Sequence, residues 1–526
     1  MKINKLKVFF GAGLLSLVIT SCGSLGTKYH TVTFDTGGGT VIEPAKIEHG
    51  EKVDKPADPV REGYTFVNWT YNDEEWSFVG YVVTEDITIT ANWSANTYTL
   101  TLVNSNVKFG EISESGKYKY DSDVTIKATP KVGYAFSGWF DKKGELVSSE
   151  EKYSFKMGLS QTLTAKWENR VYKLTVSSED DSKGTAAIIS GTGEYNNRVT
   201  IEATPKEGYA FKGWYNSSSL VNTDSRYSFI MPASNCALQA RFYTEAEAEA
   251  EREKQALGIS PKYDFTHRTV TYGLYPQKNI NDPDLIATLE QITTKQPNGW
   301  YLYENSYYAK IPYAYAYRAD GTSKFDNGTT IESNTPYWFK CEPIQWQIVA
   351  ETDNTYYLLS SVLIDAHRYD DDNGSYYDSE IRSWLNNEFY KSAFSLGNSL
   401  IQTTHVDNSS ASSYNSNNTS ASTNDKVFLP SFMDYYKNLD NYAFYCLTTD
   451  WARANGASYS TATETEYCGT YWTRSPGSKY DHSAWFVSSD GYIGDGTPDQ
   501  GGYIIFTSKL VNSPSKCARP AITISK

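Results

Sequence analysis

A seven-residue motif that occurs three times constrains the fold of this chain more than any other feature of its 526 residues. The motif is Gly-Tyr-x-Phe-x-x-Trp, and its copies occupy residues 63–69, 133–139 and 208–214. A second landmark, Ala-Thr-Pro, recurs at residues 128–130 and 203–205, with the same 75-residue spacing as the second and third motifs. Self-similarity at a fixed period is typical of tandem structural repeats. We therefore expect three related units in series.

Each unit is predicted to consist of short β-strands around a cluster of aromatic rings. Apolar and polar side chains alternate over residues 98–102 and 172–176, as in half-buried strands. Each unit also ends on an aromatic residue, which is Trp93, Trp167 or Phe242. The rings can serve adhesion if they are exposed, or they can form the core of a spacer. The spacer is favoured, because so small a unit needs its rings for packing.

The first unit carries Val-Thr-Phe-Asp at residues 32–35, three glycines at 37–39 and Pro-Val-Arg-Glu-Gly-Tyr-Thr-Phe at 59–66. These stretches closely resemble the Listeria–Bacteroides repeat, the B-repeat of internalin-type surface proteins. The other two units resemble the divergent form of that repeat, although the second has Gly158-Leu159 where the divergent family has Pro-Ala. The resemblance implies small β-grasp-like modules. Their expected boundaries are residues 29–96, 97–168 and 169–243.

The N-terminus is predicted to be a signal peptide that spans residues 1–21. Lysines precede an apolar run over residues 8–19, which is shorter than the roughly 20 residues that a membrane-spanning helix needs. The run ends in small residues before Cys22, an arrangement that resembles a bacterial lipobox. The alternative is an ordinary signal peptide with an incidental cysteine.

The lipobox resemblance implies that Cys22 carries a lipid and that residues 22–28 form a tether. The chain would then be anchored in a bacterial cell envelope, exposed at the surface or in the periplasm, and on the outer membrane in a Gram-negative cell. Its first expected partner is therefore a membrane, which it contacts through the lipid on Cys22.

Residues 244–260 are predicted to form a helical linker, and residues 261–526 a separate head domain. The linker is rich in Glu and Ala with Lys254 near its end, which suits the helix dipole, and Gly258 is placed to stop the helix. The head changes in composition to Tyr, Trp, Asn and Ser. One helix is expected after Ser379, because apolar residues follow it at helical spacing.

Four stretches of the head are distinctive, and they occupy residues 378–386, 471–477, 484–491 and 518–522. They resemble an uncharacterised domain family found at the ends of many bacterial lipoproteins and repeat proteins. The order of elements also resembles C-type-lectin-like folds related to formylglycine-generating enzymes. The expected fold class is therefore mainly β with some α (α+β), in which tandem β-grasp-like repeats precede a larger, C-type-lectin-like α+β head.

The charge and the motifs exclude several functions. The formal net charge is −14, so phosphate binding along a nucleic acid has no electrostatic basis. The six histidines form no compact metal-binding spacing, and no catalytic or nucleotide-binding signature is present, so neither a cofactor nor a metal is expected. Acidic residues between Asp365 and Asp372 can hold a cation or lie solvated on a turn, and the second is favoured. Arg382 and Arg474 are expected to form buried ion pairs that organise the fold.

The cysteines of the head are interpreted as structural. Formylglycine-generating chemistry needs two cysteines close together near the C-terminus, whereas Cys468 and Cys517 are 49 residues apart. Together with Cys341 and Cys446 they allow three pairings in an oxidising envelope. The expected disulfide joins Cys446 or Cys468 to Cys517.

A binding function is the best account of the aromatic and polar residues near the C-terminus. Sugar faces stack on Tyr and Trp rings, while Asn, Asp and Ser bond to hydroxyl groups. The candidate ligand-binding residues are Trp472, Tyr480, His482, Trp485, Asp490, Tyr492, Asp495 and Asp499. Trp472 and Trp485 are equally candidates for the core.

The sequence therefore predicts a lipid-anchored surface protein whose repeat stalk displays an adhesin-like head. The expected ligand of the head is an extracellular glycan or protein. Two alternatives remain open, namely an envelope enzyme that acts on polysaccharide or protein, and a purely structural envelope protein.

Overall fold

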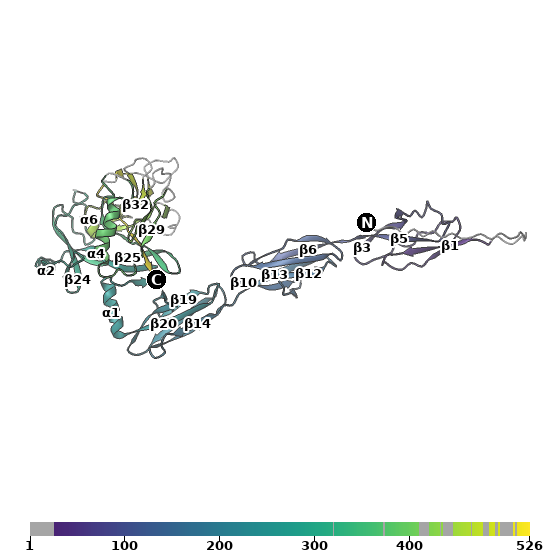
Figure 1. The fold of residues 1–526 in the computed structure, drawn as a ribbon, viewed down its shortest axis with the longest axis horizontal. Coiled ribbons are helices and arrows are strands. Elements are labelled where there is room, and N and C mark those ends of the chain that lie inside the picture. Colours follow the sequence, from purple (N-terminus) through teal and green to yellow (C-terminus); the bar gives the residue numbers. More distant parts are fainter. Residues whose placement is uncertain are drawn as a thin grey trace, which may run out of the picture. The chain divides into compact units, whose positions relative to one another are not determined.

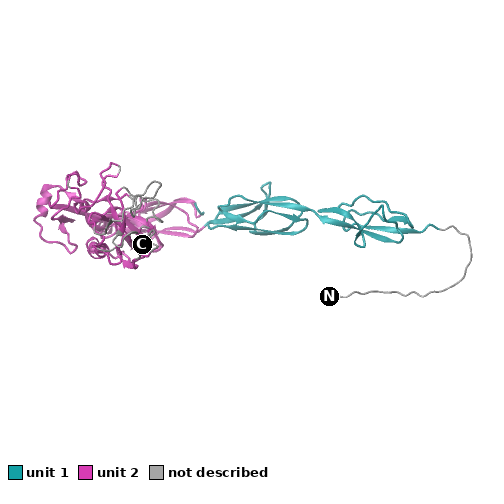
Figure 2. Cartoon of the chain, turned by 90° about the horizontal axis from the view of Figure 1, so that it is seen from above, with its two compact units in different colours: residues 1–171, 194–196 teal, residues 172–193, 197–526 magenta. Residues whose placement is uncertain are grey.

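The computed structural model describes residues 26–318, 320–371, 374–409, 420–431, 433–434, 445–463, 465–476, 483–489, 493–494, 509–510 and 513–526. The chain divides into two compact units, which are residues 1–171 with 194–196 and residues 172–193 with 197–526 (Figure 2). The third repeat thus groups with the head, and the first two repeats group together. Strands dominate both units and helices are few, which confirms the prediction of a mainly β fold with some α.

The first repeat is a single five-stranded sheet with the order β2-β1-β5-β3-β4 (Figure 1). Its central pair, β1 and β5, is parallel, and the other pairs are antiparallel. The strands are β1 (Tyr29–Asp35), β2 (Ala45–Glu48), β3 (Tyr64–Tyr71), β4 (Glu74–Glu75) and β5 (Ile87–Ala95).

The second and third repeats each form two sheets. The orders are β11-β10-β13-β6-β8 and β12-β9-β7 in the second repeat, and β14-β20-β17-β18 and β15-β16-β19 in the third. The strands of the second repeat are β6 (Thr97–Asn104), β7 (Gly110–Ile112), β8 (Gly116–Lys119), β9 (Asp123–Pro130), β10 (Tyr134–Phe140), β11 (Leu146–Ser148), β12 (Lys152–Lys156) and β13 (Gln161–Asn169). Those of the third are β14 (Leu174–Ser178), β15 (Gly184–Ser190), β16 (Arg198–Pro205), β17 (Tyr209–Asn216), β18 (Ser219–Asn222), β19 (Arg226–Ile230) and β20 (Cys236–Thr244).

The aromatic motif forms the core of each repeat, as predicted. Its tryptophan is fully buried in every copy, and its phenylalanine ring lies 5.4–5.6 Å from that tryptophan ring. The same phenylalanine also contacts the closing aromatic residue, at 5.5 Å for Phe136 and Trp167 in the second repeat. A β-bulge follows the phenylalanine in each copy and lets both large rings face inward. The first glycine of every copy has a φ near +80° or +90°, which an L-residue with a side chain rarely adopts.

A second glycine supports the closing ring in the second and third repeats, and the sequence motifs do not predict its role. A Cβ atom on Gly110 would lie 2.2 Å from the Trp167 ring, and one on Gly184 would lie 2.4 Å from the Phe242 ring. The ring therefore rests directly on the backbone at these positions, where any side chain would displace it.

The linker helix forms as predicted. Helix α1 (Glu245–Ala256) begins with a capping box, in which Glu247 accepts a bond from the Thr244 amide and Thr244 accepts one from the Glu247 amide. The bond from the Thr244 backbone lowers the pKa of Glu247. Gly258 has φ +65°, and a Cβ atom there would lie 2.5 Å from the Gly273 carbonyl oxygen. Close backbone packing therefore joins the end of the linker to the head.

The head contains two larger sheets, of seven and six strands. The first has the path β21-β22-β25-β24-β23, and β26 pairs with both β25 and the C-terminal strand β37. Its strands are β21 (Lys262–Asp264), β22 (Thr269–Ile280), β23 (Tyr301–Tyr303), β24 (Ser306–Ile311), β25 (Tyr337–Glu351), β26 (Thr355–Ser360) and β37 (Ala521–Ser525). The second sheet contains β28 (Asp365–Ala366), β32 (Tyr471–Pro476), β33 (Ser483–Val487), β34 (Ile493–Gly494), β35 (Lys509–Leu510) and β36 (Cys517–Ala518).

Short elements complete the head. The predicted helix after Ser379 is confirmed, with the Ser379 side chain as its N-cap, but a π-helical turn interrupts it. The elements are α3 (Glu380–Trp384), the π turn η1 (Leu385–Phe389) and α4 (Tyr390–Phe394), together with α2 (Pro283–Leu289) and α6 (Asp450–Ala454). Two small sheets pair β27 (Val362–Leu363) with β31 (Leu447–Thr448), and β29 (Thr404–Val406) with β30 (Thr423–Asp425).

Residues 1–21 and Cys22, the expected signal peptide and lipid attachment site, lie outside the described residues. Among the residues described, no helix is both long enough and apolar enough to cross a bilayer.

Replacing Trp139 by Ala is expected to lower the unfolding free energy of the second repeat by about 3–5 kcal/mol, because a fully buried ring is lost. The measurement is amide hydrogen exchange of peptides from β10 and β13 in the full chain. Val132→Ala is the control, since Val132 is 80% exposed in the same repeat. Equal protection in the two variants would contradict the role of the tryptophan.

Candidate functional site

The structure places two of the predicted ligand-binding residues in the core. Trp472 is 0% exposed and Trp485 is 1% exposed, so neither ring reaches the surface. The prediction that they contact a ligand is therefore corrected, and the alternative that they are core residues holds. The other six candidates, Tyr480, His482, Asp490, Tyr492, Asp495 and Asp499, lie outside the described residues.

Trp472 links the second sheet to the loop after β28. Its indole N–H donates to the His367 carbonyl oxygen at 3.0 Å, and its ring packs edge-on against Tyr369. The Lys516 ammonium lies 4.8 Å from the centre of the Trp472 ring. A ring enclosed in this way stabilises the head and has no free face for a ligand.

The arginines of the C-terminal stretches also bind groups within the protein itself. Arg474 is 6% exposed, and its guanidinium donates to the Leu429 carbonyl and pairs with Asp434. Arg519 donates to the Ser360 carbonyl and to the Tyr471 hydroxyl, each at 3.0 Å. The expectation that Arg474 forms a buried ion pair is confirmed.

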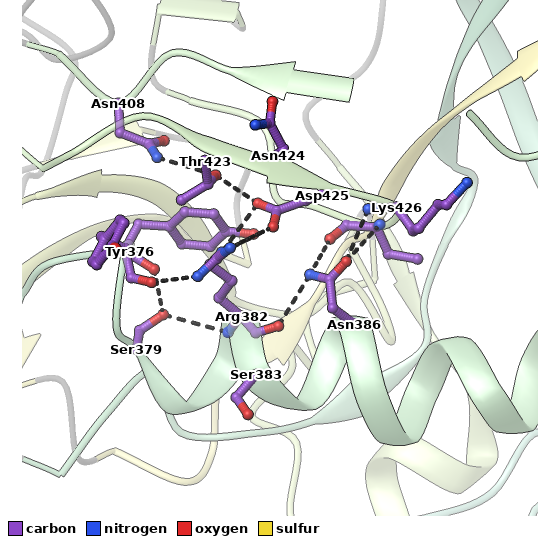
Figure 3. A network of polar contacts seen from close by, with 12 residues as sticks. Tyr376, Ser379, Arg382, Ser383, Asn386, Asn408, Thr423, Asn424, Asp425 and Lys426 are labelled. Atoms are coloured by element: carbon purple, nitrogen blue, oxygen red, sulfur yellow. Dashed lines mark hydrogen bonds and ion pairs between the residues drawn. The ribbon is translucent and has the colours of Figure 1, made fainter. Parts of the chain in front are cut away.

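Arg382 forms the second expected ion pair. Its guanidinium reaches the Asp425 carboxylate with N–O distances of 2.8, 2.9 and 3.2 Å, and Asp425 is 2% exposed (Figure 3). The Thr423 hydroxyl donates to the same carboxylate at 2.6 Å. Asp425 therefore has charged and neutral donors on both oxygens, as a buried carboxylate requires.

Nearby side chains also tie the π turn η1 to the residues that follow strand β30 (Figure 3). Asn386 donates to the Val427 carbonyl at 2.8 Å, and its side-chain oxygen accepts from the Lys426 amide at 2.9 Å. Ser379 donates to the Tyr376 carbonyl at 3.1 Å while it caps the helix. This network joins segments that are 40 to 43 residues apart in sequence, so its role is to fix the head's fold.

Asp365 is another buried acid of the head, and it is 8% exposed. Its carboxylate accepts bonds from the Tyr275 hydroxyl (2.8 Å), the Trp451 indole (2.9 Å), the Asn455 amide (3.1 Å) and the Ala366 backbone (2.8 Å). Burial raises the pKa of Asp365, and these bonds oppose that shift. The four donors use both oxygens, so Asp365 connects β22, β28 and α6 and is not directed at solvent.

The acidic cluster near Asp365 does not assemble as a cation site. Asp365 points into the core, whereas Arg368 pairs with Asp371 and with Glu380. Asp372 lies outside the described residues. In the part of the chain that the structure describes, no three His, Cys, Asp or Glu residues are placed to hold a metal ion.

The five described cysteines are free thiols. Cys446 and Cys517 are buried, and burial raises the pKa of both thiols, to about 11 for Cys446. The predicted disulfide between Cys517 and Cys446 or Cys468 is therefore wrong for this structure. These thiols pack as small apolar groups within the head.

The strongest surface feature of the head lies elsewhere, over residues 313–317. Tyr313, Tyr315 and Tyr317 are 76%, 60% and 41% exposed, while the alanines between them are buried in a small core cluster. We name these three side chains the tyrosine row. The sequence Tyr-Ala-Tyr-Ala-Tyr alternates with period two, as in an extended strand. The larger side chains of such a strand usually face the core, whereas here the tyrosine rings face outward and the alanines face inward.

The backbone of the tyrosine row is held from two sides. The Tyr315 amide donates to the Ala454 carbonyl at 2.8 Å, and Tyr315 forms an isolated parallel bridge with Asn455. On the other side, Ala314 exchanges bonds with Thr335 and Asn334 at 3.0 and 2.7 Å. The rings therefore project from a fixed extended segment, so little backbone entropy is lost when they bind a ligand.

A cleft of about 700 Å³ is a second candidate site, and it lies inside the unit formed by the third repeat and the head. One wall is the β17–β18 hairpin of the third repeat, over residues 216–222. The other wall comes from the head and includes Phe265, Tyr356 and Lys526. We name it the junction cleft.

Replacing Arg382 by Met is expected to destabilise the head by about 3–5 kcal/mol, because Asp425 is left buried without its charge partner. Hydrogen exchange of peptides over α3 and β30 measures the effect. The double variant Arg382→Met/Asp425→Leu is expected to recover much of the loss, since it removes both charges. A single variant as well protected as the wild type would argue against the ion pair.

Four segments of the chain match three known sequence families. Residues 30–92 match the Listeria-Bacteroides repeat domain, residues 98–170 and 172–246 match the Divergent InlB B-repeat domain, and residues 353–526 match a Domain of unknown function (DUF6273). The match to the last family begins at the β25–β26 turn, although β25 and β26 belong to one sheet.

Relatives share only part of the chain. A "Putative membrane protein" of Evansella cellulosilytica is 33% identical over 195 residues, which are 35% of this chain and 28% of the relative. Internalin H of Listeria monocytogenes is 31% identical over 122 residues, which are 22% of this chain and 21% of the relative. The chain thus spans less than a third of the length of these relatives.

One solved structure, the Bacillus anthracis TIE protein, aligns over 53% of this chain and 47% of its own length. The identity is 11% and the TM-score is 0.16, which carries no argument about the fold. The family matches confirm the resemblances drawn from the repeat motifs and from the C-terminal stretches. The chain therefore carries one Listeria-Bacteroides repeat, two divergent B-repeats of the internalin type and a C-terminal DUF6273 domain.

Proposed function

We propose that this protein is lipid-anchored at a bacterial cell surface, where its repeats hold a C-terminal ligand-binding head away from the membrane. The tyrosine row is the observation that carries the binding part of this proposal. Three rings at alternate positions are exposed on a segment whose backbone is hydrogen-bonded at Ala314, Tyr315 and Ala316, although a ring of this size gains stability when it is buried. Exposed apolar groups that are gathered together mark interaction surfaces.

The chemistry of tyrosine suits an extracellular ligand. Each ring offers a flat apolar face and a hydroxyl group, and it has only two rotatable bonds to immobilise on binding. Arg318 follows the row and is held by the Tyr459 carbonyl, with its guanidinium 5.0 Å from the centre of the Tyr459 ring. The charge next to the row is thus tied to the protein, which leaves the rings as the contact surface.

The cell-surface part of the proposal is supported by the repeats and the relatives. Two relatives are named as membrane proteins and a third is an internalin. The lipobox-like sequence before Cys22 supplies an anchor that needs no membrane-spanning helix. Repeats whose rings are used for their own cores suit a spacer.

Replacing Tyr313, Tyr315 and Tyr317 together by Ser is expected to weaken ligand binding by about tenfold or more, because exposed tyrosines are frequent binding hot spots. Residues 23–526 are applied to a glycan and extracellular-matrix array, and the dissociation constant is then measured for the ligand retained. Tyr29→Ser is the control, since Tyr29 is 59% exposed in the first repeat. Unchanged binding by the triple variant would contradict the role of the row.

Replacing Cys22 by Ala is expected to release the protein from the membrane fraction, because each buried CH₂ group of an attached acyl chain contributes about 0.8 kcal/mol to membrane binding. Detergent-phase partitioning of the full chain expressed in bacteria measures this. Cys236→Ala, a substitution in the third repeat, controls for the loss of a thiol. A Cys22 variant that remains in the membrane fraction would rule out lipid anchoring at this residue.

A further inference from the structure

The junction cleft is built from two parts of the chain that pack against each other. The Thr223 hydroxyl of the third repeat donates to the Tyr263 carbonyl of the head at 3.4 Å. The Tyr263 ring stacks on Phe265 with 5.4 Å between centres and lies 5.9 Å from Tyr356. Burial raises the pKa of Tyr263, and Tyr215 of the third repeat is among its near neighbours. The cleft is therefore bounded by a packed interface.

Two half-buried rings line the cleft, one from each of the two parts. Tyr227 belongs to β19 of the third repeat and stacks on Phe229, while Phe265 belongs to the head and stacks on Tyr263. Each ring has one face supported by its stacking partner. Phe265 also lies 6.4 Å from the Tyr356 ring. The parts of Tyr227 and Phe265 that line the cleft offer apolar ring surface, which suits the C–H face of a sugar ring.

The rim of the cleft is rich in neutral hydrogen-bonding groups. Asn216 and the three serines at 217–219 belong to the exposed end of the β17–β18 hairpin, and Asn354 belongs to the turn between β25 and β26. Amide and hydroxyl groups both donate and accept hydrogen bonds. They match a ligand that carries many hydroxyl groups.

The charged groups of the cleft are compensated within the protein. Lys526 pairs with Glu351 at 3.1 Å, and Arg268 pairs with the same carboxylate at 3.4 Å. The Lys526 ammonium also lies 4.6 Å from the centre of the Tyr356 ring. Asp353 adds one negative charge at the rim, so the side chains that line the cleft include two cations and two carboxylates, which favours a neutral ligand.

We infer that the junction cleft binds a neutral oligosaccharide, with its sugar rings packed against Tyr227 and Phe265 and its hydroxyl groups bonded to the hairpin and to Asn354. A volume of about 700 Å³ suits a ligand of a few rings. The inference rests on the proposed function, which places the ligand outside the cell. The junction cleft is, however, a separate site from the tyrosine row. The third repeat then acts as part of the binding domain.

The test uses residues 23–526 and four hexasaccharide probes: cellohexaose, maltohexaose and chitohexaose, which are neutral, and hexagalacturonate, which is anionic. Calorimetry gives the dissociation constants, and hydrogen exchange locates the contact. At least one neutral probe is expected to protect both residues 216–222 and residues 348–356. Tyr227→Ala is expected to weaken that binding by about tenfold.

Matched variants keep the test independent of folding. Asn216→Ala/Ser218→Ala changes only exposed side chains and is expected to weaken binding in the same direction. Lys142→Ala/Lys143→Ala alters the equivalent β10–β11 turn of the second repeat and should leave the dissociation constant within about twofold. The triple tyrosine-row variant should leave binding in the cleft unchanged.

Three results would overturn the inference: no neutral probe protects both segments, hexagalacturonate binds more tightly than every neutral probe, or the two cleft variants bind as the wild type does. If array binding still depends on the tyrosine row in that case, the proposed function is supported and only the inference about the junction cleft is rejected. In the converse case, a neutral probe protects the cleft, and the triple tyrosine-row variant binds the array as the wild type does. This result would support the cleft as a binding site and would contradict the role of the tyrosine row.

Discussion

The buried tryptophan at the end of each Gly-Tyr-x-Phe-x-x-Trp motif is the contact on which the repeats depend. A unit of about 70 residues has little interior, so one large ring supplies much of its core. The bulge after the phenylalanine lets the phenylalanine and tryptophan rings face the same core, and the glycine under the closing ring lets that ring pack directly on the backbone. The motif rings are consequently packed into the cores of the repeats.

The head is held together by different interactions from those of the repeats. Its second half consists of short strands and loops, and paired charges and buried polar groups hold these segments together. The pairs Arg382–Asp425 and Arg474–Asp434 join segments about 40 residues apart, and Asp365 connects three elements through four donors. Such networks are weak evidence for stability but strong evidence for a single arrangement, since a half-satisfied network is costly. The distinctive residues of the C-terminal stretches are thus accounted for by folding.

This explains which features could be predicted from the sequence. The repeats, the linker helix with its cap, the helix after Ser379 and the two arginine ion pairs all carry local or periodic signals. Trp472 and Trp485 could not be assigned, because an aromatic residue in a polar stretch has the same local pattern whether its ring is buried or exposed. The tyrosine row was missed because Tyr-Ala alternation normally places the larger residue inside. The disulfide prediction was wrong because the number of cysteines in a sequence does not show which thiols lie close enough to bond.

The junction cleft depends on a property that no local pattern carries, which is the packing of the third repeat on the head. Similar sequences place the second and third repeats in one family, yet the third groups with the head and the second does not. Its hairpin carries Asn216 and three serines where the second repeat has Asp141, two lysines and Gly144. The two hairpins share a fold but face different surroundings. A repeat can therefore keep its ring core for stability while the end of one hairpin is free to acquire a binding role.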